Sequence, residues 1–283
     1  MPPRSAPTAR QRRLGAELRK LRDSVGLSST EAALRLKITQ SRLSAIEGGR
    51  YGVSAERVRA FARLYDCRDA ALVDALAGMT APRRRNWWEE YRELLPAGLL
   101  DLAELEHHAR TIRTAQVTHL PGLLQTVDYA RTIFRQTIPE LPPPMVEYRT
   151  SHRIKRQQVF WAHPPKPYSA TIHEAALRMR FGGRQITREQ LAHIVTMSER
   201  DHVTVRVIPF EAGSFPGAGQ TVLYAEGTVP QLDTVQLDTE HGSEQLHSNA
   251  QLDKYRTFLD RFEAIALTPS ASRGFINQIL KAL

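Results

Sequence analysis

The chain has 283 residues, a formal net charge of +9 and one cysteine, Cys67. A single cysteine excludes an internal disulfide, and no stretch reaches the roughly eighteen apolar residues that span a membrane. The first thirteen residues contain no apolar run of the kind that a secretion signal needs. We therefore expect a cytoplasmic protein without membrane association, long enough to form two domains.

The excess positive charge is concentrated near the start of the chain. Residues 1–85 hold 18 Lys and Arg against 8 Asp and Glu, a net of +10, whereas residues 86–283 hold 21 against 22, a net of −1. This asymmetry is typical of a nucleic-acid-binding domain joined to a neutral domain. The predicted order is a flexible basic arm (1–12), a DNA-binding domain (13–81), a hinge with Pro82 and three arginines (82–85), and a second domain (86–283).

Apolar residues recur at helical spacing throughout the first of these domains. The series from Leu14 to Val25 predicts a helix that Gly26 ends. A second short helix follows, in which Ala32 and Ala33 leave room for another helix to cross closely. Together with the segment described next, the pattern predicts five short helices, the others covering residues 30–36, 58–65 and 72–76.

The stretch from residue 38 to residue 50 predicts a helix that could lie in a DNA groove. Thr39 is a suitable N-cap and Gly49 a suitable left-handed C-cap. Ile38, Leu43 and Ile46 fall on one face, and the opposite face is polar. That polar face holds Gln40, Ser41, Arg42 and Ser44. Gln and Arg can form paired hydrogen bonds with base edges in the major groove, and the short connection to the preceding helix predicts a helix-turn-helix.

The strings G-L-S-S, I-T-Q-S-R-L-S-A-I-E and E-G-G-R, within residues 14–76, resemble the Cro/phage-repressor (Xre-like) helix-turn-helix family. Lys37 stands where this family usually has a turn glycine, so the turn needs a left-handed lysine or a different geometry. Ser29 replaces a glutamine that often contacts phosphate in the family. The candidate residues for binding double-stranded DNA are Ser29, Thr39, Gln40, Ser41, Arg42, Ser44 and Arg50.

The second domain begins with helical patterns and then changes to alternating ones. Helices are predicted at residues 86–96, 101–117, 146–161, 187–199, 248–266 and 269–283, with another after Pro121 and Gly122. Strands are predicted at residues 168–173, 203–208, 221–225 and 234–237. We expect an α+β domain in which helices cover a small, mostly antiparallel sheet.

Four strings in this domain resemble a known C-terminal domain: W-W-E-E-Y-R-E-L-L-P, T-H-L-P-G-L-L-Q-T-V-D-Y-A-R, H-E-A-A-L-R and V-T-V-R-V-I-P-F-E-A-G. They are similar to the uncharacterised domain of actinobacterial WhiJ-like or antitoxin-like regulators, which follows an Xre-like module. The resemblance implies a transcriptional regulator that is often encoded beside a small partner protein. It does not identify a ligand.

Candidate catalytic groups are few in this domain. His107 and His108 are adjacent on a predicted helix and point about 100° apart, so they cannot share a metal ion as an i, i+4 pair could. Glu189 and His193 have that spacing, but such a pair is more often a surface interaction, and His173-Glu174 fits a structural role at a strand end. The 213–219 loop lacks the nucleophile-elbow and phosphate-loop patterns. We expect no catalytic residue, no cofactor and no metal.

Three arginines on one predicted helix are the candidate docking site for a partner. Arg149, Arg153 and Arg156 have spacings of four and three, which predicts a positive stripe that could accept an acidic surface or an anionic ligand. The alternative is a solvated helix face. We also expect a homodimer on a two-fold operator, because one module offers few base contacts. The apolar Leu34, at a position that is more usually polar in the family, supports this weakly.

These patterns together predict a sequence-specific transcriptional regulator rather than an enzyme. Its second domain would receive a signal from a small ligand or a small partner protein. The alternative is an antitoxin-like interaction module that neutralises a small partner protein and binds DNA secondarily.

Overall fold

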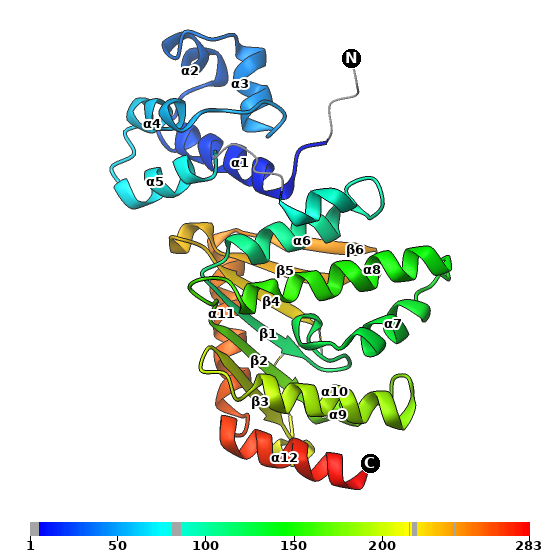
Figure 1. Ribbon diagram of the computed structural model, residues 1–283. Coiled ribbons are helices and arrows are strands. Elements are labelled where there is room, and N and C mark those ends of the chain that lie inside the picture. The colour runs from blue at the N-terminus through cyan, green and yellow to red at the C-terminus, as the bar shows by residue number, and fades with distance from the viewer. Residues whose placement is uncertain (1–5, 81–85, 215, 217–219, 240) are drawn as a thin grey trace. The chain divides into compact units, whose positions relative to one another are not determined.

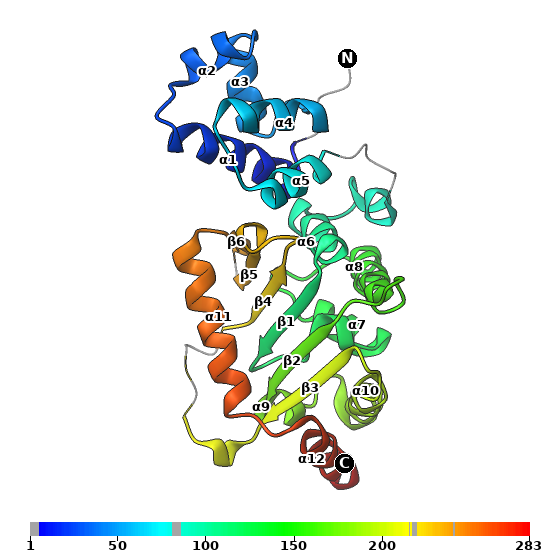
Figure 2. The ribbon, with the colours of Figure 1, turned by 90° about the vertical axis from the view of Figure 1, so that its left-hand side faces the viewer.

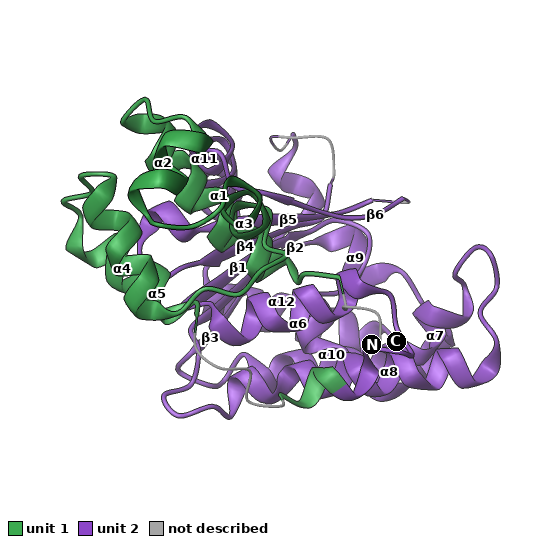
Figure 3. Ribbon diagram, turned by 90° about the horizontal axis from the view of Figure 1, so that it is seen from above, with its two compact units in different colours: residues 1–89 green, residues 90–283 purple. Residues whose placement is uncertain are grey.

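The computed structural model describes residues 6–80, 86–214, 216, 220–239 and 241–283. The chain forms two compact units, residues 1–89 and residues 90–283 (Figure 3). The predicted hinge at 82–85 and the first five residues of the predicted arm lie outside the described residues. The two units are the N-terminal unit and the C-terminal unit below.

The helices of the N-terminal unit are short, and each begins at a side-chain cap. They are α1 Ala9–Ser24, α2 Ser29–Arg35, α3 Gln40–Glu47, α4 Ala55–Leu64 and α5 Ala70–Gly78 (Figure 1). The caps are Thr8, Ser28, Thr39, Ser54 and Asp69, whose side chains accept a hydrogen bond from a backbone N–H of the first turn. Such caps satisfy backbone donors that have no partner within the helix.

Helices α1 and α3 approach each other at backbone distance. A Cβ atom on Gly15 of α1 would lie 2.4 Å from the carbonyl oxygen of Glu47, which no real side chain could tolerate. Gly49 has φ +71°, and a Cβ atom there would lie 2.8 Å from the backbone nitrogen of Arg12. Both glycines are therefore required by this contact, and Gly49 also provides the left-handed residue predicted after α3.

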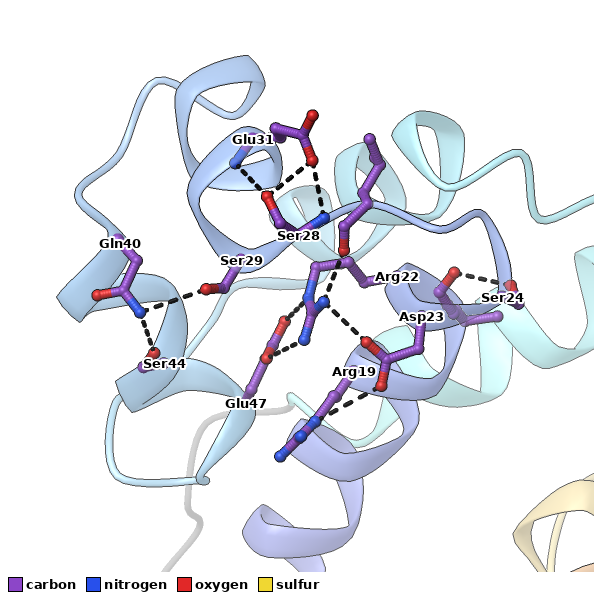
Figure 4. A network of polar contacts seen from close by, with 12 residues as sticks. Arg19, Arg22, Asp23, Ser24, Ser28, Ser29, Glu31, Gln40, Ser44 and Glu47 are labelled. Carbon is purple, nitrogen blue, oxygen red and sulfur yellow. Dashed lines mark hydrogen bonds and ion pairs between the residues drawn. The ribbon is translucent and has the colours of Figure 1, made fainter.

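A buried ion pair joins the same two helices (Figure 4). The Arg22 guanidinium of α1 donates to both carboxylate oxygens of Glu47 in α3, over 2.7 and 3.0 Å, and to the Leu27 carbonyl over 2.7 Å. The hydrogen bond that Arg22 donates to Glu47 raises the pKa of Arg22, so the guanidinium stays charged. Burial and the nearby Glu47 charge raise the pKa of Tyr65 to about 12. The paired geometry fixes the rotation of α3 as well as its distance from α1.

Removing the acidic partner should loosen α3. Glu47→Ala removes the buried carboxylate partner of Arg22 and leaves it the exposed Asp23 carboxylate, 2.7 Å away, which costs up to ~3–5 kcal/mol. Hydrogen exchange of the α1 and α3 amides in the full chain should show a drop of that order in the local opening free energy. The control Asp74→Ala removes an exposed partner of Arg59 and should cost less than ~1 kcal/mol. Equal protection in the two variants would contradict this role of the ion pair.

The C-terminal unit is built on a six-stranded sheet in the order β3-β2-β1-β4-β5-β6. The strands are β1 Thr111–Gln116, β2 Tyr168–His173, β3 Val203–Ile208, β4 Val222–Glu226, β5 Thr234–Thr239 and β6 Gly242–Leu246. β1, β2 and β3 are parallel, and the other neighbouring pairs are antiparallel. The prediction of a small, mostly antiparallel sheet was wrong: the sheet is mixed, because helices connect β1 to β2 and β2 to β3 and return the chain to the same end.

The largest error in the predicted elements concerns β1. The predicted helix over 101–117 ends at His108 instead, and the chain continues as a strand from Thr111. The run T-I-R-T is rich in β-branched residues, and both edges of the strand are paired, with β2 and with β4. Tertiary pairing on both sides therefore overrides the helical pattern.

Helices cover both faces of the sheet (Figure 2), with α11 on one face and α7, α8 and α10 on the other. The α-helices are α6 Ala97–His108, α7 Val127–Arg135, α8 Pro143–Arg156, α9 Glu174–Arg178, α10 Gly183–Met197, α11 Asn249–Ala264 and α12 Pro269–Ala282. The 3₁₀ turns are η1 Trp87–Tyr91, η2 Gly122–Leu124, η3 Gln157–Phe160, η4 Phe210–Ala212 and η5 Pro230–Leu232. No helix in the described part of the chain is long and apolar enough to cross a membrane.

Candidate nucleic-acid interface

Helices α2 and α3 form a helix-turn-helix. Lys37 lies in the turn with φ +55°, a left-handed conformation that costs a non-glycine residue about 1–2 kcal/mol. The turn is closed by backbone hydrogen bonds from Lys37 to Leu34 (3.1 Å) and from Ile38 to Ala33 (3.0 Å). The left-handed lysine is one of the two geometries expected from the sequence, and it keeps the spacing of the motif.

The two faces of α3 differ as the sequence predicts. Leu43 and Ile46 are buried, whereas Gln40, Ser41 and Arg42 are exposed. The last turn closes with hydrogen bonds from Gly49 to Ile46 (2.9 Å) and from Arg50 to Ala45 (2.8 Å), a Schellman arrangement. The apolar face holds the helix, and the polar face is open to a ligand.

Three of the candidate DNA-binding residues form one polar cluster (Figure 4). The Gln40 side-chain amide donates to the Ser44 hydroxyl over 3.0 Å and to the Ser29 hydroxyl over 3.3 Å. Ser29 is the first residue of α2, so the cluster links the two helices of the motif. The Gln40 carbonyl oxygen faces outward in a side chain whose orientation is already restricted.

Arg42 contacts a residue that the sequence reasoning did not select. Its guanidinium carbon lies 4.6 Å from the centre of the Tyr51 ring, and Nη2 donates to the Tyr51 hydroxyl over 3.1 Å. Tyr51 comes after the Gly48-Gly49 turn, which brings the chain back beside α3. The signal in the sequence was an aromatic residue next to a basic one just beyond a helix end, a common partnership for arginine.

Thr39 and Arg50 lie at opposite ends of α3. The Thr39 hydroxyl accepts a hydrogen bond from the Arg42 backbone over 3.2 Å, and it also contacts the Ser41 hydroxyl over 3.1 Å. Thr39 is thus used as the N-cap, and a contact with DNA would be additional. Arg50 is exposed and follows the C-terminal turn of α3.

The three arginines of α8 do not form the exposed stripe expected from their spacing. Arg156 is buried and donates to both carboxylate oxygens of Glu106, over 2.7 and 2.5 Å. Arg149 and Arg153 are half-buried. The basic side of α8 faces the interior, because α6 supplies the carboxylate that pairs with Arg156.

The other candidate groups of the C-terminal unit have structural roles. His173 accepts the backbone N–H of Ala175 over 3.2 Å and caps α9. Glu189 accepts a hydrogen bond from Gln185 over 2.5 Å. Among the residues that the structure describes, no group of three or more His, Cys, Asp or Glu side chains could hold a metal ion.

The two units correspond to two matches with known families. Residues 13–76 match the model of a helix-turn-helix domain. Residues 99–278, more than half of the chain, match the model described as a domain of unknown function, DUF5753. Neither a curated protein nor a solved structure matches the chain significantly.

Arg42 on α3 and Arg50 beyond its C-terminal turn lead to different predictions. Arg42→Ala should lower affinity for the preferred DNA by ~1–3 kcal/mol and relax the preference at one base position. Arg50→Ala should weaken all sequences alike and reduce the salt dependence by about one counterion, because a phosphate contact carries no sequence information. Fluorescence anisotropy with matched and shuffled duplexes at several salt concentrations measures both effects. If Arg42→Ala changed neither affinity nor preference, α3 would not be the base-contacting helix.

Tyr51 should act only through Arg42. Its ring restricts the guanidinium, and an exposed cation–π contact contributes about 0.5–1 kcal/mol. Tyr51→Ala should therefore weaken specific binding by about that amount in the wild-type background and have no effect in the Arg42→Ala background. The matched control Tyr51→Phe keeps the ring and removes only the hydroxyl, so its loss should be smaller. Additive losses in the double variant would mean that Tyr51 contacts DNA itself.

Proposed function

Since the chain belongs to the DUF5753 family and carries a helix-turn-helix domain ahead of that region, we propose that it is a sequence-specific, Xre-like transcriptional regulator. The helix-turn-helix domain itself indicates a DNA-binding regulator. The observation that supports the finer proposal is the exposed polar face of α3, held in place by the ion pair between Arg22 and Glu47. A rigid helix with a free polar face suits recognition of base edges.

In this proposal the candidate residues divide into two groups. Gln40 and Arg42 contact bases, because each carries a side chain capable of paired hydrogen bonds. The remaining residues contact phosphates or orient the side chains of Gln40 and Arg42: Ser29, Thr39, Ser41, Ser44 and Arg50. The net charge of +10 within residues 1–85 supports this division, since phosphate contacts supply most of the sequence-independent affinity.

The C-terminal unit is proposed to receive the regulatory signal, from a small ligand or a small partner protein. Its region has a net charge of −1 and gains little from DNA phosphates. The resemblance to WhiJ-like regulators, which are often encoded beside a small partner protein, supports the partner as the source of this signal. We assign no catalytic role to the unit.

We further propose that the protein binds DNA as a homodimer. Leu34, on α2, is 78% exposed, and a large apolar side chain in that position favours a contact with a second copy. Two modules about one helical turn apart would double the number of base contacts.

Selection from a random DNA library with the full-length protein tests the function. The expected product is one motif with two inverted half-sites, centred about 10 base pairs apart. Footprinting should show protection of both half-sites, and sedimentation at micromolar concentration should show a dimer. Arg42→Ala should lose the motif. Enrichment of no motif would overturn the proposal of sequence-specific binding, and protection of one half-site by a monomer would overturn the dimer alone.

A further inference from the structure

The face of the sheet opposite α11 contains a strip of polar residues. On the α11 face, Val222 and Leu237 pack with Phe262 in an apolar cluster. On the opposite face, the register places Thr114 beside Leu223 and Leu223 beside Gln236. Thr114 is 3% exposed, Gln236 3% and Gln116 7%. We call Thr114, Gln116, Thr221, Gln236 and Asp238 the polar strip.

The buried amides of Gln116 and Gln236 are hydrogen-bonded to other residues of the polar strip and to a neighbouring strand; Gln236 donates to Asp238 over 3.4 Å. Gln116 donates to Thr114 over 2.9 Å and accepts from Thr221 over 3.2 Å. Gln236 accepts from Gln245 over 3.2 Å. Each of these amides carries two N–H donors and can use one more. Apolar side chains usually occupy a sheet face that helices cover, so buried amides on this face call for an explanation.

Helices α6 and α8 lie over the part of the sheet that holds this strip (Figures 1 and 2). A Cβ atom on Gly98 of α6 would lie 2.8 Å from the Ser243 hydroxyl of β6, which places α6 against that strand. The ion pair between Arg156 and Glu106 joins α8 to α6. The Asp238 carboxylate of the polar strip acts electrostatically on Arg153 and Arg156 of α8.

The positive charges at this position exceed their partners. Arg156 has the carboxylate of Glu106. Among the described residues, Arg153 donates to the neutral Gln125 side chain over 2.6 Å and lies 4.8 Å from the centre of the Phe134 ring, while Asp238 and Glu106 act on it electrostatically. Burial, followed by the neighbouring Arg156 charge, lowers the pKa of Arg153. A half-buried cation whose hydrogen bond goes to a neutral side chain loses hydration free energy that an anion would recover.

Arg149, one turn before Arg153 on α8, adds a second charge of this kind. Its Nε atom is buried, and within the described residues it has no hydrogen-bond partner. Burial lowers the pKa of Arg149, and its charge also acts on Arg153. Two guanidinium groups four residues apart can present parallel N–H donors to the oxygens of one anion.

Arg153 of α8 lies near the carboxyl end of the central strand β1. β1 has a parallel neighbour, β2, and an antiparallel neighbour, β4, so the strand order changes direction there. Gln116 is the last residue of β1, and η2 follows at the carboxyl end. A Cβ atom on Gly122 of η2 would lie 3.1 Å from Nη1 of Arg153. Arg153 therefore lies beside η2, which follows the carboxyl end of β1.

We propose that Arg149 and Arg153 bind a small organic anion, one with a carboxylate or phosphate group, between α8 and the polar strip. The anion's charged oxygens receive the guanidinium N–H groups, and the amides of Gln116 and Gln236 donate to its other polar atoms. This rests on the proposed signal-receiving role of the C-terminal unit and gives that signal a chemical class. It is independent of how α3 contacts DNA.

Calorimetry on the full-length protein tests the site with sodium phosphate and sodium malonate, each against sodium chloride at equal ionic strength. Arg153→Gln removes the central charge. Arg135→Gln is the matched control, because it makes the same charge change at an exposed position on α7. Wild type and the control should bind phosphate, malonate or both, and Arg153→Gln should bind the same anion at least tenfold more weakly.

The basic N-terminal unit can also attract anions. Its contribution to the measured binding is the same in wild type, Arg135→Gln and Arg153→Gln, so a difference between these proteins reports the proposed site. Binding of either anion identifies the group that the site accepts. Equal binding by wild type, Arg135→Gln and Arg153→Gln would place the anion elsewhere, and no binding of either anion to wild type would overturn the site. Should Arg153→Gln fail to fold, Arg149→Gln decides by the same criterion. A negative calorimetry result would not change the result of the DNA selection, so the anion site and the DNA-binding function are tested separately.

Discussion

The buried ion pair between Arg22 and Glu47 is the contact on which the geometry of the N-terminal unit depends. α3 has two turns and only two fully buried side chains, Leu43 and Ile46, which is too little apolar surface to fix its orientation alone. The carboxylate of Glu47 receives two hydrogen bonds from α1, and the glycine contacts allow the backbones to meet. The direction in which Gln40 and Arg42 point is therefore set by the contacts of α3 with α1, made through Glu47 in its last turn.

The C-terminal unit handles buried charge differently. Arg156 and Glu106 satisfy each other, much as Arg22 and Glu47 do, and they join α8 to α6. Among the described residues, Arg153 donates its hydrogen bond to a glutamine rather than to a carboxylate, and its guanidinium lies over an aromatic ring. Arg156 is thus neutralised by a carboxylate that it contacts directly. Arg153, one turn earlier on α8, donates to an uncharged side chain instead. This difference separates a structural arginine from a ligand-binding candidate.

Local patterns predicted much of the fold. The cap at Thr39 and the turn at Gly49 were identified from residue type alone, and the strands over residues 168–173 and 203–208 were predicted at their observed bounds. Each has a strong local signal, such as a capping hydroxyl or a run of β-branched residues. The residues that bind DNA remain predictions.

The errors arose where distant segments decide the outcome. β1 was predicted as helix because its strand character comes from neighbours on both sides, and β6, G-S-E-Q-L, has few strand-forming residues and exists through pairing with β5. Parallel or antiparallel direction depends on where the connections cross, which periodicity does not encode. The burial of Arg156 was missed for the same reason, since Glu106 lies fifty residues away in the sequence.

The central position of β1 has a consequence for synthesis of the protein. Ile112 pairs with Tyr168 on one side and with Ala225 on the other, so β1 has both neighbours only after most of the chain has been made. The helices of the N-terminal unit are close in sequence, and contacts of that kind form quickly. On a ribosome that adds about 5–20 residues per second, the helix-turn-helix can fold while the sheet that follows still lacks half of its strands. In a nascent chain, α3 would then fold before the C-terminal unit, which is proposed to receive the regulatory signal.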